Sequence, residues 1–380
     1  MQPTQGNNIT ASEATVCVAF ELSKASWKLA LHDGKRDTPA IVTVKANQPT
    51  ARVNEAMAAI EATKRKWGWP SDTPVVVVYE AGQDGFWIER ALRRRGVDVK
   101  VIDPASIPVQ RQARRAKTDR IDAIRLVNSL RAWLRGERDA MHVIQVPSKQ
   151  AEAQRHQPRA RGQLQKEIMQ HRDRIGKLLG TMGCWAEIDS DFAQRLAQGQ
   201  VLCEDGEPLP TELQERLLED CERLAEAQRL LKRREERLVQ ELPAPARENI
   251  AHLSRLKGVG QVGAMRLVLE LFWRKFDNRR QVGACVGLVP QPYDSGQSRV
   301  DQGISKQGNR RVRSLLIEMA WMWLRYQPTS ALAAWFAQRT QGQNKRGRRV
   351  AIVAVARRLV IDLWKYLEHG LVPKGAAMKG

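Results

Sequence analysis

The sequence predicts a chain of three parts: an α/β domain, a helical middle region and a mainly helical C-terminal domain. Short apolar runs alternate with amphipathic stretches as far as residue 147, which is typical of an α/β domain. Over 148–249 the residues are highly charged and few are β-branched, a composition typical of long helices. Apolar helical stretches broken by glycine-containing turns follow over 250–372. The predicted domains are therefore 15–147, 148–249 and 250–372, after a loose polar N-terminus at 1–14.

The first domain is predicted to contain a mixed sheet. Residues 14–34 have the pattern of two short strands around a turn, and "AIVTVKA" continues as a third. The run "PVVVVYE" is apolar and β-branched, as in a strand that is buried on both faces, and "VDVKVID" is a further strand. Helical spacing marks "NEAMAAIEATKRKW" and "GFWIERALRRRG". A last helix carries Asp119 and Asp122.

Leucines recur every seven residues in the middle region, at Leu217, Leu224, Leu231 and Leu238. Such a repeat is typical of a coiled-coil seam. The second set of core positions, four residues after each leucine, holds Cys, Gln, Glu and Leu, of which two are polar and unsuited to a coiled-coil core. We therefore expect a helical hairpin that self-associates, interrupted by the turn-rich stretch "CEDGEPLPTE", rather than an autonomous zipper.

The C-terminal region begins with a glycine turn, Gly258 to Gly260, that opens an apolar helix. Backbone amides at such a turn can hold a phosphate, and helix packing explains the glycines about as well. We then expect a helix, a loop rich in serine and glycine, and a helix with a basic start. The basic run "NKRGRR" at 344–349 precedes a last long helix.

The charge balance predicts a polyanionic partner. Lys and Arg total 63 against 42 Asp and Glu, a net charge of +21, and such an excess attracts phosphate backbones. A merely basic soluble protein is the alternative. No basic amphipathic helix with an aromatic apolar face, signal-peptide core or membrane-spanning run is apparent, so no membrane partner is expected. The five scattered cysteines form no CxxC pair, which favours a reducing cytoplasm over disulfides or zinc.

Four carboxylates are predicted to reach a shared edge. Glu21 lies in or at the end of the first strand, Glu80 ends "VVVVYE", and Asp119 and Asp122 lie three apart on one helix face. Carboxylate oxygens are ligands that Mg²⁺ prefers, and Mg²⁺ completes its shell with substrate phosphates. Solvated strand ends and surface ion pairs with the neighbouring arginines are the alternative explanation.

These residues lie in motifs that resemble a known family. In order along the chain stand "FELSKASWKLAL", "VVYEAGQDGFW", "AKTDRIDA", "LKGVGQVGA", "VGLVPQPYDSG" and "ISKQGNRRVRSLL". The sequence resembles the DEDD-type transposases of bacterial insertion sequences, the recombinases guided by a bridge RNA. The resemblance covers roughly 15–130 and 250–370.

The resemblance implies an RNase-H-like (RuvC-like) first domain, similar to Holliday-junction resolvases. Its Mg²⁺-binding acidic tetrad falls on Glu21, Glu80, Asp119 and Asp122, with Glu21 where the family usually has Asp. It also implies a catalytic serine at Ser295. The implied partners are a guide (bridge) RNA, donor and target DNA, and further copies of the chain, as dimers that pair into tetramers. The implied location is the nucleoid in the bacterial cytoplasm.

Attack by the Ser295 hydroxyl would form a covalent phosphoserine and conserve the bond energy for rejoining. An alcohol needs activation, no histidine lies nearby in sequence, and the acidic tetrad with its metal is the expected supplement. A turn role for Asp-Ser-Gly is the alternative. The basic residues expected to contact nucleic acid are Lys117, Arg120, Arg299, Lys306, Arg310, Arg311, Lys345, Arg346 and Arg348.

The expected activity is therefore RNA-guided DNA recombination by a transposase. Two alternatives remain: a hydrolytic, structure-specific nuclease of the Holliday-junction type that uses the tetrad alone, and a non-catalytic nucleic-acid-binding scaffold. Some tryptophans, such as Trp67, Trp69 or Trp87, are candidates for base stacking, with core packing the alternative.

Overall fold

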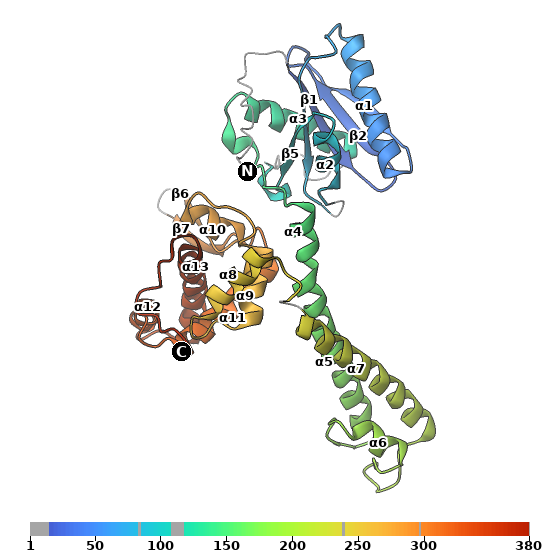
Figure 1. The fold of residues 1–380 in the computed structure, drawn as a ribbon, viewed down its shortest axis with the longest axis vertical. Coiled ribbons are helices and arrows are strands. Elements are labelled where there is room, and N and C mark those ends of the chain that lie inside the picture. Colours follow the sequence, from blue (N-terminus) through green and yellow to red (C-terminus); the bar gives the residue numbers. More distant parts are fainter. Residues whose placement is uncertain (1–14, 83–84, 108–117, 238–239, 296–297, 380) are drawn as a thin grey trace. The chain divides into compact units, whose positions relative to one another are not determined.

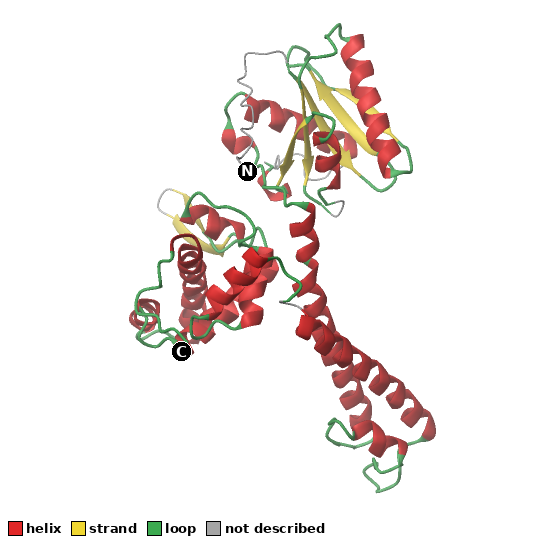
Figure 2. Ribbon diagram, in the orientation of Figure 1, coloured by secondary structure: helices red, strands yellow, loops and turns green. Residues whose placement is uncertain are grey.

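The computed structural model describes residues 15–82, 85–107, 118–237, 240–295 and 298–379 (Figure 1). The N-terminus at 1–14, expected to be loose, lies outside these residues, as does Lys117. The chain divides into two compact units, Met1–Pro147 and Ser148–Gly380. Figure 2 shows strands concentrated in the first unit and helices through most of the second. No helix of the described part is long and apolar enough to cross a membrane.

A five-stranded mixed sheet forms the centre of the first unit. Its strands are β1 (Val16–Leu22), β2 (Trp27–His32), β3 (Ala40–Val44), β4 (Val75–Glu80) and β5 (Asp98–Ile102). They lie in the order β3-β2-β1-β4-β5. β1, β2 and β3 pair antiparallel, whereas β4 is parallel to both β1 and β5. The predicted mixed sheet is therefore confirmed.

Helices cover both faces of this sheet. Side chains of α1 (Pro49–Lys66) and α2 (Trp87–Arg93) pack on the face that carries Phe20 and Tyr79. Side chains of α3 (Asp119–Leu134) pack on the opposite face, with Ala19. Short 3₁₀ turns, η1 (Pro104–Ser106) and η3 (Arg138–Ala140), complete the unit. Because both faces are covered, β4 is apolar from Val75 to Tyr79, as the sequence indicated.

A long helical hairpin begins the second unit. It contains α4 (Lys149–Gln154), α5 (His156–Gly180), α6 (Phe192–Ala197) and α7 (Thr211–Arg237). α5 and α7 run antiparallel, because Arg161 bonds Glu235 at 2.8 Å whereas Arg174 bonds Asp220 at 2.8 Å.

The leucine seam of α7 is used inside this hairpin. Leu217 and Leu224 are buried in a core that Ile175 and Leu179 of α5 share. Leu231 is half-buried, and Leu238 lies outside the described residues. The seam therefore stabilises the hairpin of one chain, and the two buried leucines are not available as the contact between copies that the repeat suggested.

The rest of the second unit packs helices around one apolar core. These helices are α8 (Ala244–Ser254), α9 (Gln261–Glu270), α10 (Arg279–Cys285), α11 (Arg310–Tyr326), α12 (Ala331–Thr340) and α13 (Lys345–His369). The segment after α13 folds back on this core: Ala377 N–H donates to the buried Gln327 side chain at 2.7 Å. The mainly helical character expected of this region is confirmed.

One element differs from the sequence expectation. The serine- and glycine-rich stretch expected as a loop forms a β-hairpin of β6 (Pro290–Ser295) and β7 (Ser298–Ile304). Two prolines, Pro290 and Pro292, hid it, because proline is rare in central strands. Both strands of a two-stranded hairpin are edge strands, in which proline is tolerated. The register also shifts between Pro290 and Pro292, as it does at a β-bulge.

Candidate functional site

The ends of β1 and β4 bring two glutamates together. The strands pair in parallel, with Val18 opposite Val77 and Phe20 opposite Tyr79. At this register the next residues on the two strands are Glu21 and Glu80. Adjacent strands lie about 4.8 Å apart, and residues opposite each other point to the same face. Glu21 and Glu80 are therefore neighbours at the carboxyl edge of the sheet, and both are half-buried.

Both glutamates belong to the face that α3 covers. Along β1 and β4 the alternate residues Cys17, Ala19, Val76 and Val78 contribute to the α3-side core. Glu21 and Glu80 continue that alternation, since successive side chains of a strand point to opposite faces.

Charges fix the direction of α3 across this face. Arg131 and Arg135, near the end of the helix, act electrostatically on Cys17 and His32. Cys17 and His32 lie opposite each other at the amino end of β1. α3 therefore runs antiparallel to β1, and its first turn lies toward the carboxyl edge.

The helix and strand rises sharpen this placement. Glu21 lies four residues, or about 13 Å, beyond Cys17 along β1. Asp122 precedes Arg131 by nine residues, and nine residues of α-helix span about 13.5 Å. The first turn of α3 thus lies level with the glutamate pair.

Asp119 and Asp122 lie on the sheet-facing stripe of α3. The buried residues of this helix are Ala123, Leu126, Val127 and Leu130, and the two aspartates continue the same i, i+3, i+4 spacing. Thr118 begins the helix by accepting a hydrogen bond from Ile121 N–H at 3.3 Å. Asp122 is 19% exposed and lies 3.4 Å from Arg125 Nη1, whereas Asp119 is exposed. Acids in a first turn also complement the helix dipole, which is the simpler explanation for their presence.

The four carboxylates share one edge and one face, but they do not form a closed metal cluster. Within the described residues, no three His, Cys, Asp or Glu side chains lie close enough to hold an ion. Asp103 follows β5 at the same edge and was not selected from the sequence. The same signal, an acid directly after an apolar strand, identifies it.

Ser295 lies at the tip of the β6–β7 hairpin. It ends β6 and is paired with Ser298, the first residue of β7. Arg299 follows on β7, opposite Asp294. The structure describes the backbone of these residues and not their side chains.

Two glycines hold the base of this hairpin against the helices. A Cβ atom on Gly287 would lie 1.9 Å from the Gln307 carbonyl oxygen, and one on Gly308 would lie 2.2 Å from that of Cys285. Both glycines have left-handed backbones, with φ of +66° and +79°. Asn309 N–H also donates to the Cys285 carbonyl at 3.0 Å. The segments that precede β6 and follow β7 are thus joined backbone to backbone.

Basic side chains gather at two helix starts. Arg310 and Arg311 open α11, which Asn309 caps by accepting from Arg311 N–H at 3.1 Å. Neither this first turn nor that of α13 contains an acid. Cations at a helix start oppose the helix dipole, so they contribute a positive potential and no helix stability. Such a site suits an anion.

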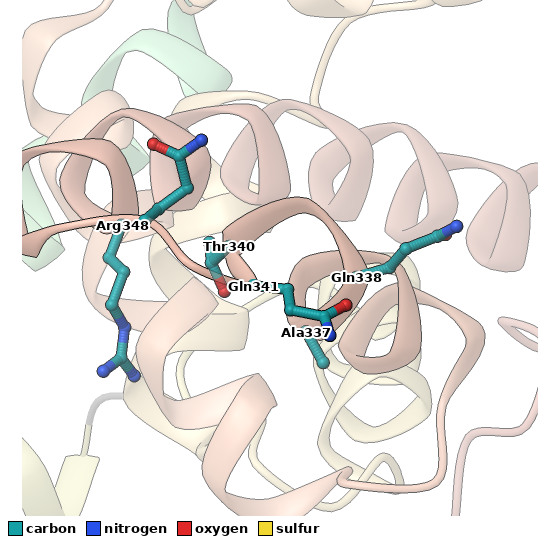
Figure 3. Close-up of a pocket in the computed structure, with 6 residues that line it drawn as sticks. Ala337, Gln338, Thr340, Gln341 and Arg348 are labelled. Carbon is teal, nitrogen blue, oxygen red and sulfur yellow. The ribbon is translucent and has the colours of Figure 1, made fainter.

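The α13 start lies beside a shallow polar pocket (Figure 3). The pocket has a volume of about 440 Å³. It is lined by Ala337, Gln338, Thr340, Gln341, Gln343 and Arg348. Lys345, Arg346 and Arg348 are all exposed, as are Arg120 on α3 and Lys306. Lys306 also has a left-handed φ of 57°, an uncommon conformation for a residue with a side chain.

The tryptophans considered for base stacking are engaged within the first unit. Arg36 covers the ring of Trp67 at 4.7 Å, and Lys35 covers that of Trp69 at 4.5 Å. Trp87 lies 5.9 Å from Trp27. Their geometry supports packing and cation–π contacts rather than base stacking.

The net charge of +21 is typical of proteins that bind nucleic acid. Comparison with known proteins specifies the class. Residues 250–334 match the family described as "Transposase IS116/IS110/IS902 family". The chain is 37% identical over its whole length to a putative transposase, y4rJ, of Sinorhizobium fredii, and the match covers 98% of that protein. The chain belongs to this family of insertion-sequence transposases.

More distant relatives are also named transposases. A transposase for the insertion sequence element IS1328 of Yersinia enterocolitica is 26% identical, over 79% of this chain and 85% of the relative. A probable family 20 transposase of Pseudomonas aeruginosa is 27% identical over 78% of this chain and 85% of the relative. The match to the family description spans the β6–β7 hairpin and the start of α11.

Proposed function

We propose that this transposase is an RNA-guided DNA recombinase that cuts and rejoins strands through Ser295. In this proposal Glu21, Glu80, Asp119 and Asp122 assist by holding Mg²⁺. The observation that carries it is the register of β1 and β4, which makes Glu21 and Glu80 neighbours on the face that α3 covers. The order of the mixed sheet supports the RNase-H-like fold that the resemblance implies.

The donor set fits Mg²⁺ in its chemistry, although the described side chains do not themselves lie close enough together to enclose an ion. All four side chains offer carboxylate oxygens, the ligands of hard cations, and they come from two strand ends and one helix turn that share an edge. Like charges at such an edge repel each other, so a bound cation also stabilises the fold there. When bound, Mg²⁺ would stabilise the negative charge that develops on the phosphate during exchange.

The serine's part follows from the chemistry of a phosphodiester. The Ser295 hydroxyl gives up its proton as its oxygen bonds to phosphorus, the bond from phosphorus to the departing DNA oxygen breaks, and that oxygen takes up a proton. The reverse attack by a DNA hydroxyl restores a phosphodiester and frees the serine. Because Arg310 and Arg311 open the helix that follows the hairpin, we propose that they hold the phosphates flanking the reacting one.

The acidic edge and Ser295 belong to different units, 1–147 and 148–380. The proposal therefore requires them to meet on one DNA substrate, within one copy of the chain or between copies of the proposed dimer or tetramer. The +21 charge supports binding of both a guide RNA and DNA, in which base pairing rather than side chains would select the target.

The experiment that tests the serine is a comparison of Ser295→Ala with Ser298→Ala. These two serines face each other across the hairpin, so the second variant controls for loss of a hydroxyl at the same place. We expect Ser295→Ala to abolish strand exchange and the covalent protein–DNA adduct on denaturing gels, with DNA binding retained. An adduct that persists in Ser295→Ala would exclude this serine as the nucleophile.

A hydrolytic nuclease is the second candidate, because the whole acidic edge lies within the 1–147 unit, apart from Ser295. It predicts that Ser295→Ala still cleaves branched DNA and leaves free ends. The guide is tested separately: purified protein should carry a discrete RNA, identified by sequencing. Full recombination by RNA-free protein would contradict RNA guidance and leave the serine chemistry standing.

A further inference from the structure

Three arginines gather where the base of the helical hairpin contacts the C-terminal helices. Arg155 lies between α4 and α5, Arg159 lies in the first turns of α5, and Arg274 follows α9. Trp273 and Glu270 lie among them. We call the three arginines, with Trp273, the arginine cluster.

The buried carboxylate of the cluster is already engaged. Glu270 is 2% exposed, and its Oε2 atom lies 3.4 Å from Arg159 Nη2. The same oxygen accepts from Asn309 Nδ2 at 3.2 Å. Asn309 also caps α11. Glu270 therefore joins the helical hairpin to the start of α11 through Arg159 and Asn309. This structural role uses only one of the three arginines.

The other two arginines contact no carboxylate at salt-bridge distance among the described residues. Arg155 lies over the Trp273 ring at 5.8 Å and Arg274 at 4.7 Å. Arg274 Nη1 lies 2.9 Å from Cys285 Sγ, a weak acceptor. Burial, together with the charges of Arg159 and Arg274, lowers the pKa of Arg155, and Glu270 and Glu152 offset only part of this. The cluster thus has more positive charge than its surroundings balance.

Hydrogen bonding in the cluster is also incomplete. The Nε atoms of Arg155, Arg159 and Arg274, and Nε1 of Trp273, are buried and have no partner in the described structure. A buried donor without an acceptor costs about 1–3 kcal/mol, and four at one place are unusual in a folded protein. The cluster reaches solvent through Arg159, whose side chain is 28% exposed.

We propose that the arginine cluster binds a phosphate group of the DNA backbone. A phosphodiester supplies the missing negative charge and several acceptor oxygens, and the planar guanidinium group suits both. Duplex DNA is the occupant to which we commit, because the chain is a transposase. Arg159 of the cluster contacts Glu270, and Glu270 accepts a hydrogen bond from Asn309, the residue that caps the basic start of α11. The inference rests on the proposed function for the identity of the ligand and not for the existence of the site.

The test compares Arg155→Gln/Arg274→Gln with Arg223→Gln/Arg229→Gln. The control pair removes the same charge from exposed positions of α7 that already have acidic partners. Binding of duplex DNA is measured over a range of salt concentrations, in the Ser295→Ala background so that no strand is cut. Each lost phosphate contact should lower the slope of log affinity against log salt by about 0.9. We expect the Arg155→Gln/Arg274→Gln variant to weaken binding about tenfold or more and to lower this slope by about 0.9, and the control variant to leave it unchanged.

Inorganic phosphate provides a second measurement that needs no nucleic acid. It should raise the melting temperature of the parent protein, because a ligand of the folded state stabilises it, and this gain should be smaller in the cluster pair than in the control pair. An unchanged salt slope for DNA in the cluster pair overturns the proposal. So does a loss confined to RNA. Neither result bears on the covalent adduct at Ser295, so failure here and failure of the proposed function are distinguishable.

Discussion

The carboxyl edge of the first unit and the base of the β6–β7 hairpin hold candidate residues in different ways. At the sheet edge, position follows from register: apolar residues of β1 and β4 pair along the strands, and the glutamates are the next residues. At the hairpin base, position follows from close backbone contact, which two left-handed glycines permit. The first arrangement tolerates changes of the functional side chain, because the core lies elsewhere. The second tolerates almost no added atom at the glycines themselves.

The largest effect is expected from Gly308→Ala. The new Cβ atom would overlap the Cys285 carbonyl oxygen at 2.2 Å, and backbone cannot move aside as a side chain can. Overlap and left-handed strain together should cost about 3 kcal/mol or more. Gly303→Ala is the matched control, since Gly303 has the same φ of +79° and nothing within 4 Å of its Cβ position. It should cost only the conformational term, about 1–2 kcal/mol.

Urea unfolding and strand exchange measure the two glycine variants. We expect Gly308→Ala to lose exchange together with stability, and Gly303→Ala to keep most of both. Equal costs in the two variants would show that the contact between Gly308 and Cys285 does not hold the hairpin base.

This contrast also explains what the sequence predicts and what it leaves out. The sheet is predictable because runs such as that from Val75 to Tyr79 are apolar wherever two covered faces require it. The hairpin was missed because β6 contains two prolines and because backbone atoms, rather than side chains, hold its base against the helices. Close contacts at Gly287 and Gly308 depend on segments that only folding brings together. The arginine cluster was missed for the same reason, since Arg155 and Arg274 lie far apart in sequence.

The next effect concerns the acidic edge. Glu80→Gln keeps the size of the side chain and removes one charge, so cleavage should fall by about 100-fold or more, as loss of a metal ligand does. Melting temperature should stay the same or rise without Mg²⁺, because repulsion between Glu21 and Glu80 is relieved. Asp98→Asn is the control at the opposite, amino end of β5, where Asp98 pairs with Lys100 at 2.9 Å.

Titration with MgCl₂ separates a metal ligand from a solvated acid. The parent protein and Asp98→Asn should gain melting temperature as Mg²⁺ is added, whereas Glu80→Gln should gain much less. If Glu80→Gln cleaves DNA at the parent rate, Glu80 is a solvated strand-end residue, and the carboxyl edge of the sheet has no catalytic role.

The smallest effect tests the direction of α3, on which the placement of Asp119 and Asp122 depends. His32 is fully buried, and its Nδ1 accepts from Gly34 N–H at 2.8 Å. Burial chiefly, and then the charge of Arg131, lowers its pKa from 6.5. If α3 runs antiparallel to β1, Arg131→Gln should raise the pKa of His32, whereas Arg120→Gln at the other end of the helix should leave it unchanged. Titration of the imidazole by NMR measures both.

The same group sets a pH dependence whose sign follows directly. Because the folded pKa of His32 lies below the unfolded value near 6.5, the unfolded chain binds more protons in acid. The stability of the first unit should therefore be fully present above pH 6.5 and fall as pH drops through the folded pKa. Hydrogen exchange of β1 and β2 amides between pH 7.5 and 5 should show this loss, and Arg131→Gln should reduce it. An Arg131→Gln variant with the parent's His32 titration would place the end of α3 away from the amino edge, and with it the first turn away from Glu21 and Glu80.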